Sequence, residues 1–407
     1  MRNKLELPQI SLKERDRRWN MVREEMKKSG LDALLLCGLP SNWDFTVANA
    51  RFLTQIGGNA EFNYVVFPLE GEVTSFVLMP TFLEYWSKAQ DWVKDIRARK
   101  GTWADGIVSR LKELGLEKKR IGVDGLATAL DADGWFPYSV YQRILELMPG
   151  ATFENLNDLL ERVRMVKSPE EIDNLEQAAT VGDRMLEAIR TTAKSGVKES
   201  EVYGKVMEVM LANGGEEPTL FLWSSDAHPL PHPFRLATMR PLSKGDLIIC
   251  EMHPKYGGYF THVERTFSLG EPEDGYLKIY DGCLAAYNRG MEMFLPGGKI
   301  SEAMGAIKAM IQSRGLAICE TGIHGHGLSS LDYPRYRHHA PKADDKALQL
   351  IGDEFKPGMV FAFNIDLVNP GWRNGETGCV FAETVLVTEG KPKRLHSFPT
   401  NFQIIGK

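Results

Sequence analysis

The chain has 407 residues, of which 43% are hydrophobic, and 49 Lys and Arg residues against 54 Asp and Glu residues give a net charge of −5. This length predicts two domains or one large domain, able to bury a real core, and the composition excludes a disordered or fibrous chain. Nucleic acid is not an expected partner, because phosphate binding needs a concentrated excess of Lys and Arg.

The sequence also lacks the signals of membranes and of oxidising compartments. No stretch approaches the roughly 18 consecutive apolar residues of a membrane helix, and the opening MRNKLELPQISLKERDRRWN lacks the apolar centre of a signal peptide. The five cysteines lie far apart and are never spaced as CxxC, so neither a disulfide framework nor a thiolate zinc site is indicated. We therefore expect a cytoplasmic protein with no membrane partner.

The first part of the chain alternates between helix and strand patterns. Ser11 followed by Glu14 predicts the start of a helix over residues 11–29, and Gly30 suits its left-handed end. Apolar runs predict strands at 31–38, 64–69, 73–79 and 120–125, and helical patterns cover 104–114 and 139–148. We therefore predict an α/β N-terminal domain over residues 1–160.

The pattern changes near residue 160, and we predict a second domain over residues 161–407. Ser168, with Pro169 and two acidic residues after it, starts a long helix. Helices are predicted at 168–194, 199–212 and 301–314, a hairpin of strands at 246–252 and 259–269, and further strands at 359–366 and 379–388.

Polar side chains interrupt these otherwise apolar strands. Side chains two residues apart share a face of a strand, so His262 and Glu264 point the same way and Glu251 can face them across the hairpin. Asn364 and Asp366 share a face in the same manner. Ionisable groups among Phe, Ile and Val must be satisfied, which favours a functional site; a wet sheet edge is the alternative interpretation.

Two pairs of histidines lie in segments with unusual backbones. His324 and His326 lie in the glycine-flanked segment 322–330, predicted to be a loop that a ligand or another chain segment can approach closely. His228 and His232 lie in the proline-rich loop 224–234, which could aim an imidazole at little entropy cost. Ordinary structural roles are the alternative for both pairs.

The segments RMVKSPEEI, KGDLIICE, GGYFTHVERTF, GHGL, KPGMVFAF and ETVLVTEG follow one another in this order. Together they resemble the creatinase/prolidase/aminopeptidase P superfamily, and the resemblance covers nearly the whole chain. It implies an α/β creatinase-like N-terminal domain followed by an α+β pita-bread catalytic domain. It also implies a small-molecule substrate and a homodimer, in which the partner subunit completes each active site.

The metallopeptidase members of this superfamily hold two divalent metals with two Asp, one His and two Glu. At these positions the chain has, in order, Glu251, His262, His326, Asn364 and Ala382, so only the histidine is kept. Two metals about 3.5 to 4 Å apart need bridging carboxylates, which this set cannot provide. The resemblance thus implies that the dinuclear centre is lost.

We therefore expect no metal cofactor. The alternative is a single Zn, Fe or Mn ion on Glu251, His262 and His326, assisted by Glu383 or Asp366, because mixed nitrogen and oxygen ligands suit such metals.

Creatinase, a metal-free member, resembles this chain more closely, because its GYYTxLERT strand corresponds to GYFTHVERT here. The resemblance places Glu264 at the acid of that strand and His232 at the acid–base histidine, with His228 as a rival. In such a mechanism the imidazole takes a proton from water and returns it to the departing nitrogen, while the carboxylate holds a cationic substrate. Together with His326, these are the predicted catalytic residues.

Other positions depart from creatinase. Asn364 replaces its second Glu, and its arginine for the substrate carboxylate has no counterpart near Glu61, so creatine itself is not the expected substrate. Arg335 or Arg337 could hold a substrate carboxylate instead, the alternative being a solvent-exposed loop charge. The side chains predicted to contact the substrate are Glu251, His262, Asn364, Arg335, Arg337, Tyr333, Trp223 and Glu61.

The sequence thus predicts a hydrolase that cleaves a carbon–nitrogen bond in a small nitrogenous metabolite, such as an amidino, cyclic-amidine or betaine-like compound. One alternative is a mononuclear-metal relative, either a peptidase or a lyase. The other is a binding module that kept the fold and lost the chemistry.

Overall fold

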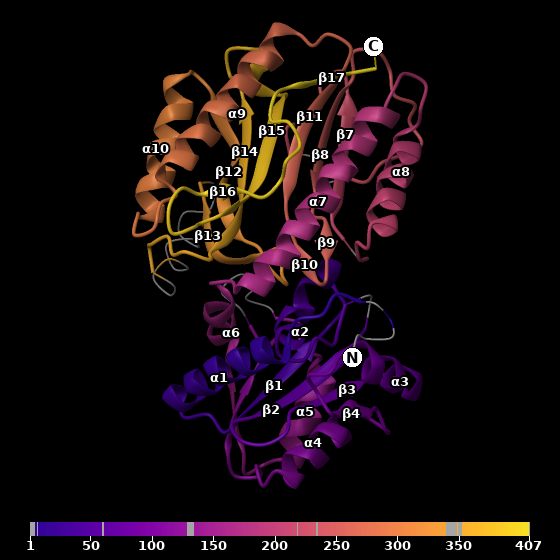
Figure 1. The fold of residues 1–407 in the computed structure, drawn as a ribbon, viewed down its shortest axis with the longest axis vertical. Coiled ribbons are helices and arrows are strands. Elements are labelled where there is room, and N and C mark those ends of the chain that lie inside the picture. Colours follow the sequence, from indigo (N-terminus) through magenta and orange to yellow (C-terminus); the bar gives the residue numbers. More distant parts are fainter. Residues whose placement is uncertain are drawn as a thin grey trace. The chain divides into compact units, whose positions relative to one another are not determined.

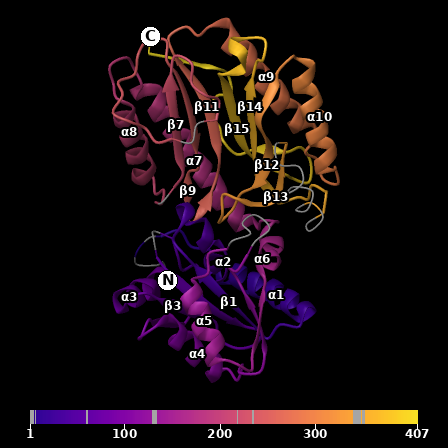
Figure 2. The ribbon, with the colours of Figure 1, turned by 180° about the vertical axis from the view of Figure 1, so that it is seen from behind.

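The computed structural model describes residues 5, 7–58, 61–127, 134–217, 219–232, 235–338, 348 and 352–406. Residues 233 and 234 of the proline-rich loop are outside this set. The chain forms two compact units, Met1–Arg164 and Met165–Lys407 (Figures 1 and 2). The first is an α/β unit and the second contains a curled antiparallel sheet, which confirms the predicted fold class.

The N-terminal unit is built on a six-stranded sheet in the order β4-β3-β2-β1-β5-β6, in which β1 is antiparallel to β2 and parallel to β5. Its strands are β1 (Ala33–Gly38), β2 (Asn63–Pro68), β3 (Thr74–Val77), β4 (Asp95–Ala98), β5 (Arg120–Val123) and β6 (Thr152–Asn155). Its helices are α1 (Leu12–Ser29), η1 (Asn42–Val47), α2 (Ala48–Thr54), α3 (Pro80–Ala89), α4 (Trp103–Glu113), α5 (Tyr138–Leu147) and α6 (Asn157–Arg164).

Helices cover both faces of this sheet. On one face Val66 of β2 packs in a core cluster with Ile107 of α4 and Ile144 of α5. The next residue of β2, Phe67, points to the other face, where it meets Trp19 of α1 edge-on at 5.9 Å. The strands are therefore buried on both sides, which explains why β1 is a continuous apolar run rather than an alternating one.

The C-terminal unit is built on a sheet in the order β13-β12-β14-β15-β11-β8-β7, with β16 paired to β15 and β17 paired to β11. Its strands are β7 (Phe221–Asp226), β8 (Leu247–Met252), β9 (Lys255–Tyr256), β10 (Tyr259–Phe260), β11 (Val263–Leu269), β12 (Ala317–Gly325), β13 (Asp332–Arg337), β14 (Val360–Val368), β15 (Gly378–Leu386), β16 (Lys393–Arg394) and β17 (Gln403–Ile405). Its helices are α7 (Pro169–Thr192), α8 (Glu199–Ala212), α9 (Asp274–Met293), α10 (Ile300–Ser313) and η2 (Arg373–Gly375).

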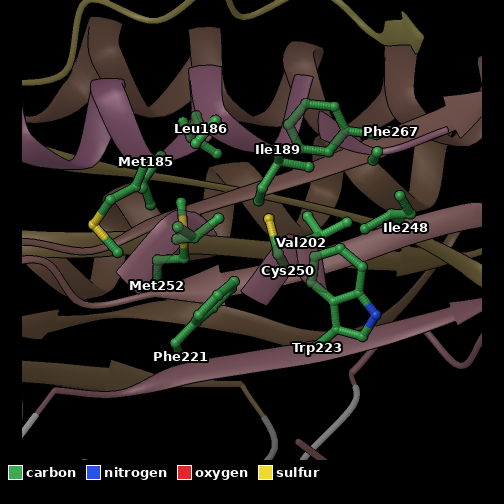
Figure 3. Packing of buried hydrophobic residues seen from close by; sticks show 14 of the residues in the cluster. Met185, Leu186, Ile189, Val202, Phe221, Trp223, Ile248, Cys250, Met252 and Phe267 are labelled. Atoms are coloured by element: carbon green, nitrogen blue, oxygen red, sulfur yellow. The ribbon is translucent and has the colours of Figure 1, made fainter. Parts of the chain in front are cut away.

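These helices cover one face of the curled sheet. Figure 3 shows Met185 and Ile189 of α7 packed over Phe221 and Trp223 of β7, within the main apolar core of the unit. Full burial of such large apolar side chains contributes about 1.5–3 kcal/mol each to stability. Because side chains alternate along a strand, every second residue of these strands points to the opposite face, where the polar residues gather.

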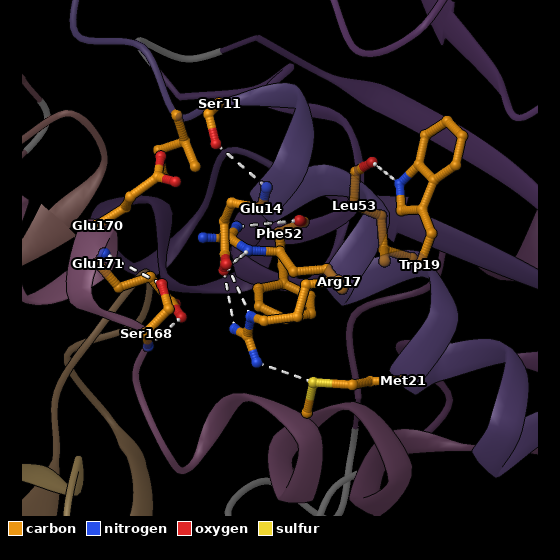
Figure 4. Close-up of polar contacts among 12 residues, drawn as sticks. Ser11, Glu14, Arg17, Trp19, Met21, Phe52, Leu53, Ser168, Glu170 and Glu171 are labelled. Carbon is orange, nitrogen blue, oxygen red and sulfur yellow. Dashed lines mark hydrogen bonds and ion pairs between the residues drawn. The ribbon is translucent and has the colours of Figure 1, made fainter.

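The predicted helix starts are confirmed in both units (Figure 4). In α1 the Ser11 hydroxyl accepts a hydrogen bond from the backbone N–H of Glu14 at 3.2 Å, and Gly30 ends the helix with φ 67°. In α7 the Ser168 hydroxyl accepts from the Glu171 N–H at 3.3 Å, while the Glu171 carboxylate accepts from the Ser168 N–H at 3.0 Å. Each cap satisfies backbone donors that the first helical turn leaves without partners.

The prediction of a loop over residues 322–330 is wrong for its first part. Residues up to Gly325 form the end of β12, which pairs with β13 on one side and β14 on the other. A Cβ on Gly322 would lie 2.2 Å from the carbonyl oxygen of Tyr336, and one on Gly325 would lie 2.1 Å from that of Tyr333. The glycines therefore permit a close approach of two strands, which the sequence pattern does not distinguish from a loop.

None of the helices in the described part of the chain is both long enough and apolar enough to cross a lipid bilayer.

Candidate active site

One row of positions crosses the polar face of the C-terminal sheet. In register, Glu251 of β8 pairs with Glu264 of β11, Glu264 with Ala382 of β15, Ala382 with Asn364 of β14, and Asn364 with Gly322 of β12. The row thus presents two carboxyl groups, a methyl group, an amide and a bare backbone. It brings together three of the five positions that the metallopeptidase resemblance singled out, namely Glu251, Ala382 and Asn364.

Four histidines lie beside this row, and all four are buried. The ring of His262 lies 4.3 Å from that of His253, 5.5 Å from that of His324 and 5.7 Å from that of His326. The rings of His324 and His326 are 5.0 Å apart, and those of His253 and His326 are 5.4 Å apart. The predicted pair His262 and His326 is therefore part of a larger imidazole cluster.

The curl of the sheet brings these rings together. His262, just before β11, and His324, on β12, are separated by β15 and β14, and three strand spacings of a flat sheet would be about 14 Å. The residues between them are Thr384, whose hydroxyl accepts from the His262 N–H at 2.7 Å, and Ala362, which pairs with His324. Since both are small, the imidazoles can meet above them.

Burial determines the protonation of these rings. It lowers the pKa of His262, His324 and His326 well below the usual range, and the charge of neighbouring histidines or arginines lowers each further. At neutral pH these rings are therefore uncharged. Both ring nitrogens of His326, and the Nδ1 atoms of His253, His262 and His324, lack side-chain hydrogen-bond partners among the described residues.

The facing carboxyl groups of Glu251 and Glu264 have different surroundings. Burial works to raise the pKa of Glu251, but a 2.9 Å hydrogen bond to His253 Nε2 and the nearby histidine charges lower it overall. Burial, with the charge of Glu251, raises the pKa of Glu264 to about 8. Glu264 also contacts His262 Nε2 at 3.2 Å and lies beside Asp366, which works to lower the pKa of Glu264 but does not outweigh burial. One carboxyl group thus favours ionisation and the other favours its proton.

His232 lies between two acids on the same face. Its Nδ1 is 2.8 Å from Asp366 and its Nε2 is 2.9 Å from Glu320. Burial works to lower the pKa of His232, but the two carboxylates raise it to about 11. A ring that keeps its proton at neutral pH cannot accept one from water, so the predicted role of His232 as a base does not fit this geometry.

The rival histidine lies elsewhere. His228 Nδ1 is 2.9 Å from the Tyr276 hydroxyl, and its side chain is 40% exposed. Of the two histidines in this loop, His232 is the one beside Glu264 and Asp366.

Two predicted site residues point away from the polar face. Trp223 pairs with Cys250 rather than with Glu251, so its indole packs in the apolar core beneath the helices and is not a substrate contact (Figure 3). Glu383 is likewise one residue out of phase with Ala382, and Arg265 and Arg394 bind its carboxylate. Glu383 is therefore unsuited to the assisting metal-ligand role predicted for it.

The remaining predicted contacts are distributed as follows. Arg337 and Arg335 of β13 pair with Gly322 and His324, which places both on the polar face, and Arg337 lies 3.5 Å from Glu320. Tyr333 is fully buried at the start of β13. Glu61 belongs to the N-terminal unit, where it accepts hydrogen bonds from Trp86 Nε1 at 3.3 Å and from the Leu78 N–H at 3.4 Å.

Comparison with known proteins identifies the scaffold. The model of metallopeptidase family M24 matches residues 173–389, more than half of the chain. The chain belongs to metallopeptidase family M24. The model of the creatinase/prolidase N-terminal domain matches residues 18–166 of this M24 protein.

Curated relatives of this M24 protein have several names. It is 28% identical over 270 residues to a Xaa-Pro dipeptidase of Pyrococcus furiosus, covering 65% of this chain and 73% of the relative. It is 22% identical over 410 residues to a creatinase of Bacillus sp., covering 96% and 92%. It is 24% identical over 277 residues to an ectoine hydrolase of Halomonas elongata, covering 65% and 66%. The chain therefore belongs with hydrolases of carbon–nitrogen bonds.

Solved structures support the fold. A Xaa-Pro dipeptidase from Bacillus anthracis aligns with a TM-score of 0.76 at 22% identity, covering 96% of this chain and all (100%) of that one. An X-Pro aminopeptidase from Thermotoga maritima aligns with a TM-score of 0.75 at 18% identity, covering 95% and 99%. At these identities the likeness concerns the fold alone.

The side chains of this M24 protein do not fit a pair of metal ions. Ala382 offers no donor atom in the middle of the row, and Asn364 offers a neutral amide. Two cations placed side by side would lack the bridging carboxylates that offset their repulsion. Groups whose ligand atoms lie within 4.8 Å of one another are instead His262, His324 and His326; Glu251, His253 and His262; and His232, Glu264 and Asp366.

Two residues at this site were missed by the sequence reasoning. His253 lies two residues beyond Glu251, so extending the alternation of β8 by one step would have placed it on the polar face. Glu320 lies on β12. This strand was not predicted, because the glycines around His324 suggested a loop. The signal for His253 was present in the sequence, whereas that for Glu320 depended on recognising β12.

Proposed function

We propose that this M24 protein hydrolyses a carbon–nitrogen bond in a small nitrogenous compound, of the amidino, cyclic-amidine or betaine-like kind, without a dinuclear metal centre. The observation that carries this proposal is the direct pairing of Glu251 with Glu264 in a row where Ala382 and Asn364 replace carboxylates. Two relatives bear the names creatinase and ectoine hydrolase, which supports a substrate other than a peptide.

The two facing carboxyl groups suit complementary roles. Glu251 accepts a hydrogen bond from His253, an arrangement that favours its ionised form and makes it the base for the attacking water. The ligand atoms of Glu264 and Asp366 lie within 4.8 Å of each other, and burial with the charge of Glu251 raises the pKa of Glu264 to about 8, so Glu264 favours its protonated form at neutral pH. Glu264 is therefore assigned as the acid that protonates the departing nitrogen, in place of the cation-binding role predicted for it.

The reaction then balances without other reagents. The water oxygen forms a bond to the substrate carbon as its proton passes to Glu251, and the carbon–nitrogen bond breaks as Glu264 gives its proton to the nitrogen. Transfer of the proton from Glu251 to the facing Glu264 restores both groups. His232, held by Asp366 and Glu320, acts as a positioning residue that fixes the acid pair.

The surrounding charges indicate which substrate the site accepts. The carboxylate of Glu251 lies on the polar face and favours a substrate with a cationic nitrogen centre, whereas Glu320 and Asp366 are already paired with His232. Arg335 and Arg337 are on the neighbouring strand of the same face, where they suit a carboxylate at the other end of the substrate. A zwitterionic metabolite could therefore place its cationic nitrogen near Glu251 and its carboxylate near Arg335 or Arg337.

A panel of substrates tests this proposal. Zwitterionic amidino, cyclic-amidine and betaine-type compounds are assayed for product release beside Xaa-Pro dipeptides, once with chelator and once with added Mn²⁺. We expect at least one panel compound to be hydrolysed with kcat/KM at least about 100-fold above that of any dipeptide, a difference of about 2.7 kcal/mol. Dipeptide cleavage that exceeds every panel compound would contradict the proposal.

A further inference from the structure

A cluster of three histidines on the polar face is not used by the proposed acid–base chemistry. His262, His324 and His326 offer ring nitrogens that all lie within 4.8 Å of one another. We propose that these three side chains form a binding site for a single late first-row transition-metal ion, of which Zn²⁺ is the representative. His262 and His326 occupy positions that the dinuclear members use, whereas His324 on β12 does not, so the three-histidine site extends toward β12.

The unsatisfied ring nitrogens are the first support for this site. His326 is fully buried, and its ring nitrogens have no side-chain hydrogen-bond partner in the described part of the chain, although the backbone of Phe260 lies close enough to raise its pKa slightly. Among the described residues, the Nδ1 atoms of His262 and His324 also lack a side-chain partner, and these two side chains are buried as well. A buried polar atom without a partner costs about 1–3 kcal/mol, and an ion bound to all three rings would offset this cost at each of them.

The geometry is the second support. Imidazole nitrogens bound to zinc at about 2.0–2.1 Å in a tetrahedron are about 3.3–3.4 Å apart. The observed limit of 4.8 Å thus requires a contraction of no more than about 1.5 Å. His262 Nε2 already contacts the carboxyl group of Glu264 at 3.2 Å, the arrangement by which a second residue orients a metal-bound histidine.

The donor atoms select the kind of metal and the number of ions. Three imidazoles suit Zn²⁺, Co²⁺ or Ni²⁺, whereas Mg²⁺ and Ca²⁺ prefer oxygen ligands. A second ion beside the first would have only Ala382 and Asn364 where bridging carboxylates are needed. The site therefore binds one ion per chain, held by three imidazoles, and Glu251 and Glu264 lie on the Nε2 side of His262, at 3.8 Å and 3.2 Å.

Calorimetric titration tests the site directly. The full-length protein is stripped with a chelator and titrated with Zn²⁺ in the absence of substrate. We expect one ion per chain, and at least a 100-fold weaker affinity in each of the variants His324→Gln and His326→Gln, because each removes one of three ligands. The matched control is His228→Gln, whose side chain is partly exposed and bonded to Tyr276, and it should change the affinity less than twofold.

X-ray absorption at the zinc edge of the wild-type protein keeps the test decisive if a variant fails to fold. We expect three imidazole nitrogens at about 2.0–2.1 Å from the metal. Failure to bind Zn²⁺, binding of two ions per chain, fewer than three imidazoles around the ion, or unaltered affinity in both folded variants would each overturn the inference. None of these readouts contains substrate, so their failure is distinguishable from a failure of the proposed hydrolysis.

Discussion

Glu264 differs from Glu251 because of its immediate neighbours, although the two residues are paired across adjacent strands. A hydrogen bond from His253 lowers the pKa of Glu251, whereas burial and the charge of Glu251 raise the pKa of Glu264. Two identical side chains can therefore serve as base and acid, because their environments separate their proton affinities. The difference in proton affinity between Glu251 and Glu264 depends on a few contacts, so a single substitution should change the catalytic rate measurably.

Replacement of Glu264 by Gln removes the transferable proton and keeps the size of the side chain. We expect kcat to fall by about 100-fold or more with the substrate identified in the panel, since general acid catalysis contributes about 10²–10⁴-fold. The matched control is Glu389→Gln at an exposed position after β15, which should leave kcat unchanged. Steady-state kinetics measure both, and a loss below threefold for Glu264→Gln would remove this residue from the proton-transfer step.

His232 should leave a pH signature in stability. Its pKa is raised to about 11 in the folded state by Asp366 and Glu320, so its charge stabilises the fold fully below its unfolded pKa of about 6.5. That contribution is lost as the pH rises toward 11. We expect the difference in unfolding free energy between wild type and His232→Gln to shrink steadily from pH 6.5 to pH 10, as measured by urea denaturation.

The control for this pH series is His228→Gln in the same loop, where the side chain is partly exposed. Its difference from wild type should stay small and flat over the same pH range. A His232→Gln difference that does not vary with pH would contradict the assignment of a charged imidazole between the two acids.

At the scale of elements, the alternating strands were the most predictable feature. Period-two spacing placed His262 with Glu264 and Asn364 with Asp366 on shared faces, and the resulting rows contain the site. Patterns could not reveal how far the sheet curls, which decides that His262 and His324 meet across two intervening strands. Nor could the patterns reveal that the side chains of Trp223 and Glu383 point to the face opposite the site, because each lies only one residue from a position on the polar face.

The closeness of β12 and β13 yields a prediction about two glycines. In Gly322→Ala the new methyl group would lie 2.2 Å from the carbonyl oxygen of Tyr336, so we expect a loss of several kcal/mol in unfolding free energy. Gly305 is exposed within α10 and has nothing within 4 Å of its Cβ position, so Gly305→Ala should instead stabilise by about 0.5–1 kcal/mol. Thermal unfolding compares the two, and equal effects would contradict the strand assignment.

At the scale of the whole molecule, the fold identifies the family, whereas the residues of the site decide which substrate the protein accepts. The chain belongs to metallopeptidase family M24, and relatives that it resembles are named for both peptide and non-peptide substrates. The choice between a peptide and a non-peptide substrate depends on a few positions in the row from Glu251 to Gly322. Ala382 matters most among them, because its methyl group offers no ligand atom to a metal ion. The homodimer implied by the creatinase resemblance stays a prediction, to be tested by sedimentation of the full chain.

The loss of the dinuclear centre is the claim on which this account depends. Crystals of the full chain grown with excess Mn²⁺, measured for anomalous scattering at the manganese edge, test it most directly. We predict at most one anomalous peak on the polar face, beside the histidine rings and away from Ala382. Two peaks about 3.5–4 Å apart between Glu251 and Asn364 would contradict the account and assign the protein to the dinuclear metallopeptidases.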